Sequence, residues 1–482
     1  MAGSKGAHDL TSGPIGKTLL LFALPTLGSN ILQSLNGSIN SIWVGRFLGE
    51  QALAATANAN MVMFLMFSIV FGFGMAATVV IAQAIGAGDM EAARRAFGSA
   101  VGFCFLLAMA VATVGFIISP ALLRLLGTPA EAFGLALSYL RVIFVALPAT
   151  LLGVMTMMGL RGAGDARTPF KFMLVSVGVD IVLNPVLILG LGPFPALGIA
   201  GSAGATAAAG FISLISLIIY IYRQDLPLRL RGKELAWLWP APAQLRVILG
   251  KGLPMGLQMI VMSASGLVMI GLVNREGLLT TAAYGAAQQL WTYLQMPSMA
   301  MGAAVSAMAA QNIGAGRWDR IGRVTGYGLG YLLLITGAML VLMLLFDRPL
   351  LALFLGGDSP AIDVARHMQM LASWSFLIFG CAMILFGVMR ANGVVVAPLV
   401  ILFLTLFGVR LGFYELAYPR LGADALWLSF PVGSGVGFLA AAALYLHGGW
   451  RKARLLIPPH EEECREQVHA EAEPAGRITP TG

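Results

Sequence analysis

The chain has 482 residues, of which 58% are hydrophobic and 11% are charged, and its mean hydropathy is +0.84. An ordinary soluble domain carries about 25% charged residues, so this composition excludes a soluble globular protein and predicts an integral membrane protein. The net charge of +8 is spread over several loops and does not gather on one face, which argues against a nucleic-acid-binding protein.

Apolar stretches long enough to cross a bilayer recur along the whole chain. A helix needs about 20 apolar residues to span the hydrocarbon core, and on that criterion we predict an all-α integral membrane protein with about twelve transmembrane helices. The predicted helix cores are, in chain order, 18–44, 53–84, 96–118, 132–158, 170–190, 198–221, 252–273, 281–310, 325–346, 367–389, 394–415 and 424–446. The first core continues from an amphipathic start and is followed by the others, so we expect no cleavable signal peptide.

The loops between the predicted helices differ in their content of Lys and Arg. If the N-terminus is cytoplasmic, the cytoplasmic loops hold most basic residues and the opposite loops mostly one each, as the positive-inside rule requires. We therefore predict a multi-pass protein with both termini in the cytoplasm, and the compact loops favour a bacterial inner membrane. The basic residues assigned to the cytoplasmic side are Arg94, Arg95, Arg161, Arg167, Lys171, Arg317, Arg320, Arg323, Arg451, Lys452, Arg454 and those within 223–251.

The two halves of the chain repeat each other. Residues 83–96 (QAIGAGDMEAARRA) match residues 311–324 (QNIGAGRWDRIGRV), at an offset of 311 − 83 = 228. Residues 160–169 (LRGAGDARTP) return as residues 389–398 (MRANGVVVAP), at an offset of 389 − 160 = 229. Because each half contains an even number of predicted spans, we expect two pseudo-symmetric six-helix bundles that form a parallel repeat.

The repeat and the changes in composition predict the domain organisation. We expect an N-lobe over 1–222, a cytoplasmic linker over 223–250, a C-lobe over 251–447 and a disordered tail over 448–482. The linker contains prolines, mixed charges and two tryptophans, so part of it is expected to be an interfacial amphipathic helix. A cleft between two such lobes is where transporters bind their substrates.

Motifs for other chemistry are lacking in the sequence. The three cysteines and five histidines show neither metal-ligand spacing nor a disulfide framework. The spans contain no nucleophile and base in a recognisable arrangement, and the chain has no Walker lysine motif. We therefore expect no enzyme, no cofactor, no ATP-driven transport by this chain alone, and no metal apart from a coupling ion.

Several segments together resemble one family of transporters. The chain is similar, over about residues 15–446, to the MATE family of multidrug and toxic-compound extrusion transporters. The segments that carry the resemblance are LPTLGSNILQSLNGSINSIWVGRFLGEQALAA (24–55), LRGAGDARTPF (160–170), VGVDIVLNPVLILG (177–190), GLPMGLQ (252–258), AAYGAAQQL (282–290) and the paired QAIGAGD and QNIGAGR loops. The resemblance implies two six-helix bundles in a V that export cationic amphipathic compounds in exchange for H⁺ or Na⁺ by alternating access. The expected partners are small organic cations and the lipid bilayer, with a monomer as the functional unit.

One carboxylate lies well inside a predicted span, and ionisable groups at membrane depth are costly enough to suggest a function. Asp180 precedes Asn184 by one helical turn, so both side chains share a face, and Pro185 loosens the backbone beside them. We predict that Asp180, with Asn40, Asn184 and Asn36, forms the ion-coupling site, where Na⁺ would find oxygen ligands and a proton would neutralise the acid. The alternative is a buried acid hydrogen-bonded to Asn184 or Asn40 for structure alone.

The chain departs from the family pattern at this place. Many members have Asp where this chain has Asn40, and the commoner order in the fifth span is Asn followed by Asp. The sodium-coupled branch carries acids in the seventh and tenth spans, whereas here those regions read MIVMSASGL (259–267) and FLIFGCAMILF (376–386). We therefore expect coupling in the N-lobe, as in DinF-like members, and favour H⁺ because one carboxylate suffices for a proton.

The C-lobe contains the residues predicted to contact substrate. Methionine side chains are flexible and suit surfaces that accept many shapes, and a cation can rest on an aromatic face. The predicted substrate-binding residues are Gln258, Met262, Tyr284, Gln288 and Met296. The alternative is that the methionines at helical spacing face lipid or pack in the core.

An arginine occurs near the position equivalent to Asp180 in the second half, 180 + 229 = 409. Arg410 could pair with Glu415, reach a cleft, or extend to the membrane interface, and we favour the interface because the predicted span ends nearby. An exporter or flippase of a lipid-linked or anionic metabolite is the alternative function. A cleft lined by several cations would favour it, and Arg141 and Arg410 are the candidates.

Overall fold

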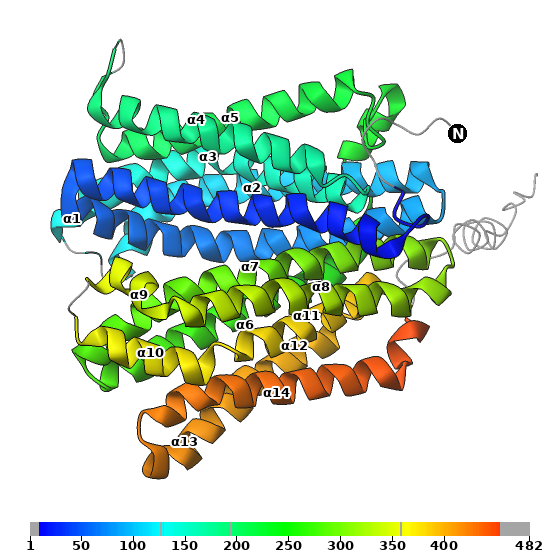
Figure 1. Cartoon of the computed structure of the whole chain (residues 1–482). Helices are drawn as coiled ribbons and strands as arrows, with labels where there is room; N and C mark the ends of the chain where they lie inside the picture. Colours follow the sequence, from blue (N-terminus) through cyan, green and yellow to red (C-terminus); the bar gives the residue numbers. More distant parts are fainter. Residues whose placement is uncertain (1–8, 126–127, 129, 193–194, 357–358, 454–482) are drawn as a thin grey trace, which may run out of the picture.

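The computed structural model describes residues 9–125, 128, 130–192, 195–356 and 359–453, and the regular elements of this part are all helices (Figure 1). This confirms the predicted all-α fold class. We call α1–α5 the N-lobe and α6–α14 the C-lobe. The N-lobe helices are α1 (Ile15–Gly86), α2 (Met90–Leu125), α3 (Ala130–Gly162), α4 (Arg167–Leu189) and α5 (Ile199–Arg223).

The C-lobe follows after a connection that contains the short helix η1 (Gly232–Leu238). Its helices are α6 (Pro242–Arg275), α7 (Leu278–Gly314), α8 (Trp318–Leu345), α9 (Asp347–Leu355), α10 (Ala361–Ala372), α11 (Ser375–Ala391), α12 (Val396–Phe403), the π-helix η2 (Leu404–Val409), α13 (Arg410–Leu421), α14 (Asp424–His447) and η3 (Gly449–Lys452). The helices lie roughly parallel or antiparallel, with the N-lobe above the C-lobe in the view of Figure 1. The division into lobes at the predicted boundaries stays a proposal.

The long helix α1 contains the first two predicted spans. Its backbone leaves the helical conformation at Gly49, where φ is 82°, a value in the left-handed region that glycine adopts without a steric penalty. The two candidate spans on either side of this break are Ile15–Gly49 and Met66–Gly86. The glycine therefore separates two helices, each of which contains a candidate membrane span.

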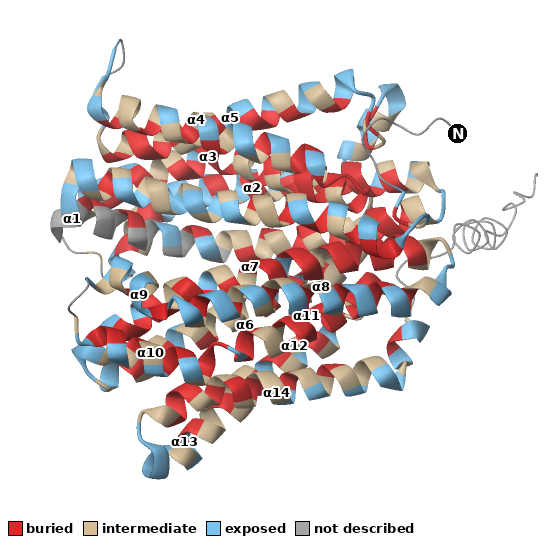
Figure 2. Ribbon diagram, in the orientation of Figure 1, coloured by how far each residue is buried: buried red, intermediate tan, exposed pale blue. Residues whose placement is uncertain are grey.

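Ten helical segments of the described chain are long and apolar enough to cross a membrane, and the pair α10 and α11, bent by 41°, gives an eleventh if counted as one span. We expected about twelve spans. The difference is α7, which covers the predicted span 281–310 but is not among the candidate spans of the described chain. α7 packs against α1, α8, α10 and α11, and its buried residues concentrate where it meets them (Figure 2). A helix surrounded by protein needs little apolar surface for lipid, so α7 contains more Gly, Ala, Ser and Gln than a lipid-facing span.

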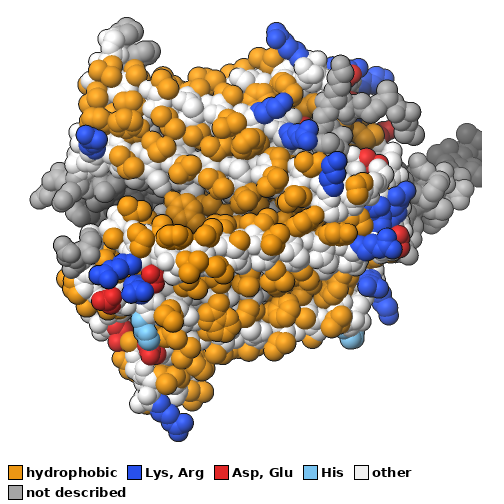
Figure 3. All heavy atoms as spheres, viewed as in Figure 1, with side chains coloured by type: hydrophobic (Ala, Val, Ile, Leu, Met, Phe, Trp, Pro, Cys, Tyr) orange, Lys and Arg blue, Asp and Glu red, His pale blue; other side chains and the backbone are white. Residues whose placement is uncertain are grey.

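Large apolar side chains cover the outer surfaces of the spans. They are exposed along α2, α5 and α8, for example at Ile117, Ile215 and Leu334. Figure 3 shows hydrophobic side chains as a broad band on one face of the molecule, with Lys and Arg concentrated at the end that holds both described chain ends. A protein in water would bury such a band, so the surface is the one expected of a protein embedded in a bilayer.

Close helix packing within the N-lobe depends on glycine. A Cβ atom at Gly201 of α5 would overlap the carbonyl of Leu187 in α4, whereas one at Gly204 would lie 3.8 Å from the Leu187 side chain. We expect Gly201→Ala to destabilise the protein by about 1–3 kcal/mol through overpacking. Gly204→Ala, in the same helix, should leave the stability unchanged or slightly raised. Thermal unfolding of the two purified variants checks this, and equal melting temperatures would contradict it.

At two of the predicted boundaries, helical structure extends further than expected. The predicted linker 223–250 is too long, because α6 begins at Pro242, and the helix within it packs on protein: Glu234 of η1 forms an ion pair with Arg94 of α2 at 2.9 Å. The predicted disorder begins too early, because residues 449–452 form η3, in which Trp450 is 2% exposed. The indole of Trp450 gives η3 an apolar anchor, because the other residues of this short helix are a glycine and two basic residues. Residues 1–8 of the predicted N-lobe and 454–482 of the predicted tail lie outside the described residues.

Candidate ion-coupling cluster and substrate cavity

The fifth predicted span, α4, presents an acid and an amide to the interior of the N-lobe. Asp180 and Asn184 lie one turn apart, and they are 2% and 1% exposed, because α4 packs against α1, α3 and α5 at this level. Pro185 lies inside the helix. Since proline has no N–H, it cannot donate to the carbonyl of Ile181, and this frees a backbone oxygen one residue from the acid.

Hydrogen bonds connect the α4 pair to the neighbouring helices. Thr206 of α5 donates to the Asp180 carboxylate at 3.1 Å. The Asn184 amide donates to the side-chain oxygen of Asn40 in α1 at 3.1 Å, and the Ser202 hydroxyl donates to the same oxygen at 2.7 Å. The structure therefore brings together three of the residues predicted for ion coupling and adds two hydroxyl groups.

The fourth predicted residue, Asn36, also belongs to this group, because its side chain interacts with Asp180, while Tyr139 of α3 interacts with Asn40. The side-chain oxygens of Asn36 and Asn184 are buried without a hydrogen-bond partner. Buried acceptors without donors are rare, and here two of them lie in the same group of side chains as a carboxylate. We call this group the N-lobe polar cluster; its members are Asn36, Asn40, Tyr139, Asp180, Asn184, Ser202 and Thr206.

A cavity of about 1070 Å³ lies between the lobes, lined by α1, α2 and α3 of the N-lobe and by α6, α7, α11, α13 and α14 of the C-lobe. Of the residues predicted to contact substrate, Met262, Tyr284 and Gln288 line it. Its wall is predominantly apolar and aromatic with few polar groups, which is the usual composition of a site for small organic molecules.

Two predicted substrate residues are placed elsewhere. Gln258 is buried and donates from its amide to the carbonyl of Val395 at 3.1 Å, which ties α6 to the start of α12. Met296 is buried within α7. Neither is among the described residues that line the cavity.

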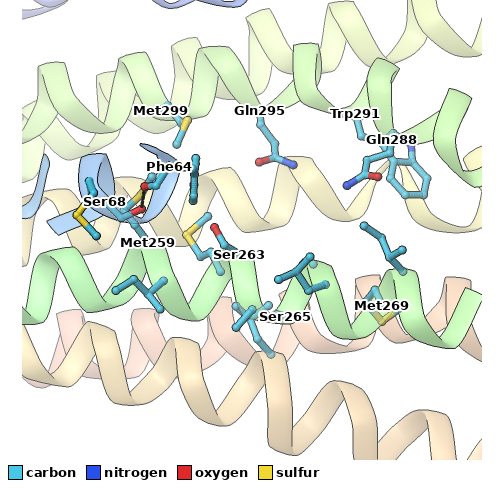
Figure 4. Close-up of a pocket in the computed structure, with 18 of the residues that line it drawn as sticks. Phe64, Ser68, Met259, Ser263, Ser265, Met269, Gln288, Trp291, Gln295 and Met299 are labelled. Atoms are coloured by element: carbon cyan, nitrogen blue, oxygen red, sulfur yellow. Dashed lines mark hydrogen bonds between the residues drawn. The ribbon is translucent and has the colours of Figure 1, made fainter. Parts of the chain in front are cut away.

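One face of α7 supplies the two predicted residues Tyr284 and Gln288 and also Trp291, Gln295 and Met299, which were not among the predicted set. Tyr284, Gln288, Trp291, Gln295 and Met299 recur every three or four residues and line the cavity together. Figure 4 shows Met299 and Gln295 of α7 on the side of the cavity opposite Met259 and Ser263 of α6, with Gln288 beside Trp291 nearer Met269. The helical spacing of 284, 288, 291, 295 and 299 is the signal that could have identified this face from sequence.

The expectation that Arg410 extends to the membrane interface is wrong. The candidate span continues to Leu421, beyond the predicted end at 415, so Arg410 lies near the middle of Val396–Leu421. Its side chain is 7% exposed and lines the cavity. Arg141, the other predicted candidate, is not among the described lining residues, and its guanidinium lies 5.1 Å from the ring of Phe116.

The MatE family profile matches two segments of the chain, residues 25–186 and 254–414, which together cover more than half of it. The chain belongs to the MatE family. The two matched segments begin 254 − 25 = 229 residues apart, the same offset as the repeat in the sequence. Membership of a family of transporters means that this multi-pass membrane protein is not an enzyme.

Named relatives of this MatE protein are bacterial. It is 35% identical to the probable multidrug resistance protein YoeA of Bacillus subtilis (strain 168), over 92% of this chain and 95% of that protein. It is 28% identical to the FAD transporter of Shewanella oneidensis, over 73% of this chain and 76% of that protein. A solved outward-facing structure of a multidrug resistance MATE family transporter matches it with a TM-score of 0.84 at 22% identity, covering 94% of this chain and 98% of that one. That likeness shows a shared fold.

The repeated glutamines of this MatE protein meet at one end of the interface between the lobes. Gln83 of α1 donates from its amide to the carbonyl of Ala391 in the C-lobe at 2.6 Å. Gln311 of α7 donates to the carbonyl of Gly162 in the N-lobe at 3.0 Å. Because 311 − 83 = 228 and 391 − 162 = 229, the two contacts are repeat-equivalent and reciprocal.

The glycines of the same repeated motifs let the backbones touch. A Cβ atom at Gly86 would overlap the carbonyl of Gln311, and one at Gly314 would overlap the carbonyl of Gln83. The backbone N–H of Leu10, near the N-terminus, also donates to the side chain of Gln311 at 3.3 Å. We call this set of contacts the inter-lobe seal, formed by Gln83, Gly86, Gly162, Gln311, Gly314 and Ala391.

Proposed function

We propose that this MatE protein is a secondary antiporter that exports amphipathic organic compounds in exchange for H⁺ or Na⁺ by alternating access. The observation that carries the proposal is a buried carboxylate, Asp180, surrounded by unpaired amide oxygens in one lobe, together with a large cavity between the lobes. Multidrug efflux as the physiological role is supported by the names of relatives such as the probable multidrug resistance protein YoeA.

In this proposal the N-lobe polar cluster binds the coupling ion. A proton would neutralise Asp180 and weaken its attraction for the amide groups of Asn36 and Asn184. Sodium would instead be held by the carboxylate and the two unpaired amide oxygens. Either ion removes the uncompensated charge that Asp180 places in the membrane interior. Coupling in the N-lobe alone would make the protein a DinF-like member of its family.

The inter-lobe seal is proposed to close the cytoplasmic end. Both described chain ends lie at this end, where Lys and Arg are concentrated (Figure 3), and the positive-inside rule assigns it to the cytoplasm. Ser68, which lines the cavity, precedes Gln83 of the seal by 15 residues of α1, or about 22 Å along a helix. The arrangement matches an outward-facing conformation, with both termini cytoplasmic in a bacterial inner membrane.

Two substrate classes follow from the cavity. Cationic amphipathic compounds are supported by aromatic faces such as those of Trp291 and Phe376, on which a cation can rest. An exporter of an anionic metabolite is the second candidate, and it is favoured by Arg410 in the cavity wall and by the relative named FAD transporter. We expect a monomer to suffice, because both lobes of the site belong to one chain.

Proteoliposomes that contain the purified protein test the antiport proposal. Efflux of a fluorescent amphipathic dye should be accelerated by an inward gradient of either H⁺ or Na⁺, imposed separately, and the gradient that drives efflux identifies the coupling ion. Protein-free liposomes and liposomes with collapsed gradients are the controls. Efflux that is the same with and without both gradients would contradict antiport.

A further inference from the structure

The cavity wall contains one formal charge among its described lining residues, the guanidinium of Arg410. The other polar groups of the wall are hydroxyls and amides, such as those of Ser263 and Gln295, and no Asp or Glu is among the described residues that line it. The nearest acid along the chain, Glu415, is exposed on the same helix. Within the described chain, none of the ion pairs includes Arg410. Among the described residues, the guanidinium therefore has no acidic partner.

Helix α14 holds the guanidinium in one orientation. The Nε atom of Arg410 donates to the hydroxyl of Ser429 at 3.4 Å, and the guanidinium carbon lies 3.4 Å from the centroid of the Phe430 ring. The Nη2 atom is buried and has no hydrogen-bond partner. Stacking on an aromatic ring stabilises a cation in part, but a buried donor without an acceptor remains unfavourable.

An irregular helical turn directly precedes Arg410. The π-helix η2 (Leu404–Val409) ends at the residue before Arg410, and such π-turns inside helices are rare and frequently occur at functional sites. Opposite the side chain, α14 has Gly433, where a Cβ atom would lie 3.6 Å from the Cβ of Arg410. The π-turn shifts the helical register immediately before Arg410 and so helps to position its charge at the cavity wall.

From this geometry we propose that the cavity binds amphipathic organic anions, whose carboxylate or phosphate group pairs with Arg410. The guanidinium presents donors in a planar fork that matches the two oxygens of such a group. One of these donors, Nη2, has no acceptor in the protein. The apolar body of the ligand would lie against Trp291, Phe376 and Phe430, which line the same cavity. This inference rests on the proposed export function and specifies its substrate class.

The separation of charges in the molecule supports this assignment. Asp180 and the rest of the N-lobe polar cluster are not among the described lining residues of the cavity. An anion beside Arg410 would therefore not face the Asp180 carboxylate in this conformation. A cationic ligand, in contrast, would be repelled by Arg410, the only formal charge of the described wall. This repulsion would be strong, because electrostatic interactions are weakly screened in such surroundings.

Two dyes that differ in one group test the proposal. Rhodamine 110 carries a free carboxylate, and rhodamine 123 is its methyl ester. We expect the purified wild-type protein to bind rhodamine 110 about tenfold or more tightly than rhodamine 123, since hydrogen bonds to charged groups stabilise complexes by this order. Arg410→Gln should remove this preference and leave the affinity for rhodamine 123 unchanged or higher. Fluorescence polarisation measures both affinities.

Matched variants separate the binding role from a general loss of charge or fold. Arg420→Gln removes one positive charge from the exposed end of the same helix, and it should keep the wild-type preference. Arg410→Lys keeps the charge but lacks the planar fork, so its preference should be weaker than that of the wild type, and it replaces Arg410→Gln if the latter does not fold. Equal affinities of the wild type for the two dyes, or an unchanged preference in the Arg410 variants, would overturn the proposal.

The transport assay distinguishes this inference from the antiport proposal on which it rests. If an ion gradient drives both dyes equally in the wild type and in Arg410→Gln, antiport stands and the anion site is wrong. If the carboxylate preference depends on Arg410 while neither dye responds to a gradient, the anion site stands and antiport is wrong. A phosphate-bearing amphipathic dye in a third arm shows whether Arg410 accepts phosphate as well as carboxylate, and a phosphate dye that gains nothing from Arg410 would overturn the phosphate part of the proposal.

Discussion

Replacing Asp180 by Asn is expected to reduce gradient-driven efflux to the level of protein-free liposomes. The substitution keeps the size of the side chain and an acceptor for Thr206, which donates to Asp180 at 3.1 Å. It removes the negative charge that the proposed coupling ion would neutralise, so a proton finds no carboxylate to bind and Na⁺ loses its counter-charge in the N-lobe polar cluster. Efflux should be measured with each gradient separately, beside the thermal stability of the purified variant.

Two further variants make this result specific. Asp319→Asn removes an exposed acid at the start of α8, and it should retain wild-type efflux. Adding Asn184→Asp to Asp180→Asn returns a carboxylate one turn along the same face of α4, still beside Asn40, and should restore part of the ion dependence. Full ion-driven efflux in Asp180→Asn would show that coupling occurs elsewhere.

The second large effect is expected at the inter-lobe seal. Gly86→Ala and Gly314→Ala each place a Cβ atom on a backbone carbonyl of the opposite lobe, which a rotamer change cannot relieve. Overpacking of this kind costs about 1–3 kcal/mol, and here the cost falls only on the conformation in which the lobes touch. We therefore expect the closed state to be depopulated about 5- to 150-fold and efflux to fall, while the fold of each lobe persists.

Spin labels at Arg95 and Arg323 would report this change. Both residues are exposed near the seal, on α2 and α8, and they are repeat-equivalent because 95 + 228 = 323. The distance between the labels should increase in Gly86→Ala and Gly314→Ala. Gly326→Ala provides the control, since a Cβ atom at this position of α8 meets nothing within 4 Å. An unchanged distance in the seal variants would show that the lobes close by another contact.

The sequence predicts features that the bilayer imposes and misses those that depend on contacts between helices. Apolar length predicts the spans because lipid cannot satisfy a backbone group, and the i, i+4 relation brings Asp180 and Asn184 to one face. Ser202 and Thr206 were not predicted, because the groups that accept hydrogen bonds from their hydroxyls lie on other helices. Ser and Thr are also common in membrane spans, so their presence alone gives no signal. Arg410 was misplaced because an error of a few residues in the end of a span moves a charge from the interface to the membrane centre.

The inter-lobe seal has the form of an isologous contact, in which each half offers the other the same groups, as in a two-fold homodimer. In a homodimer one substitution alters both copies of a contact, whereas in this fused chain each copy can change alone. The C-lobe copy has already acquired a further role, because Asn312 donates to the carbonyl of Leu10 at 3.0 Å and Gln311 accepts from its N–H. The N-terminal segment is thus tied to one half of the contact only, so the opening of the seal need not be equally costly for the two lobes.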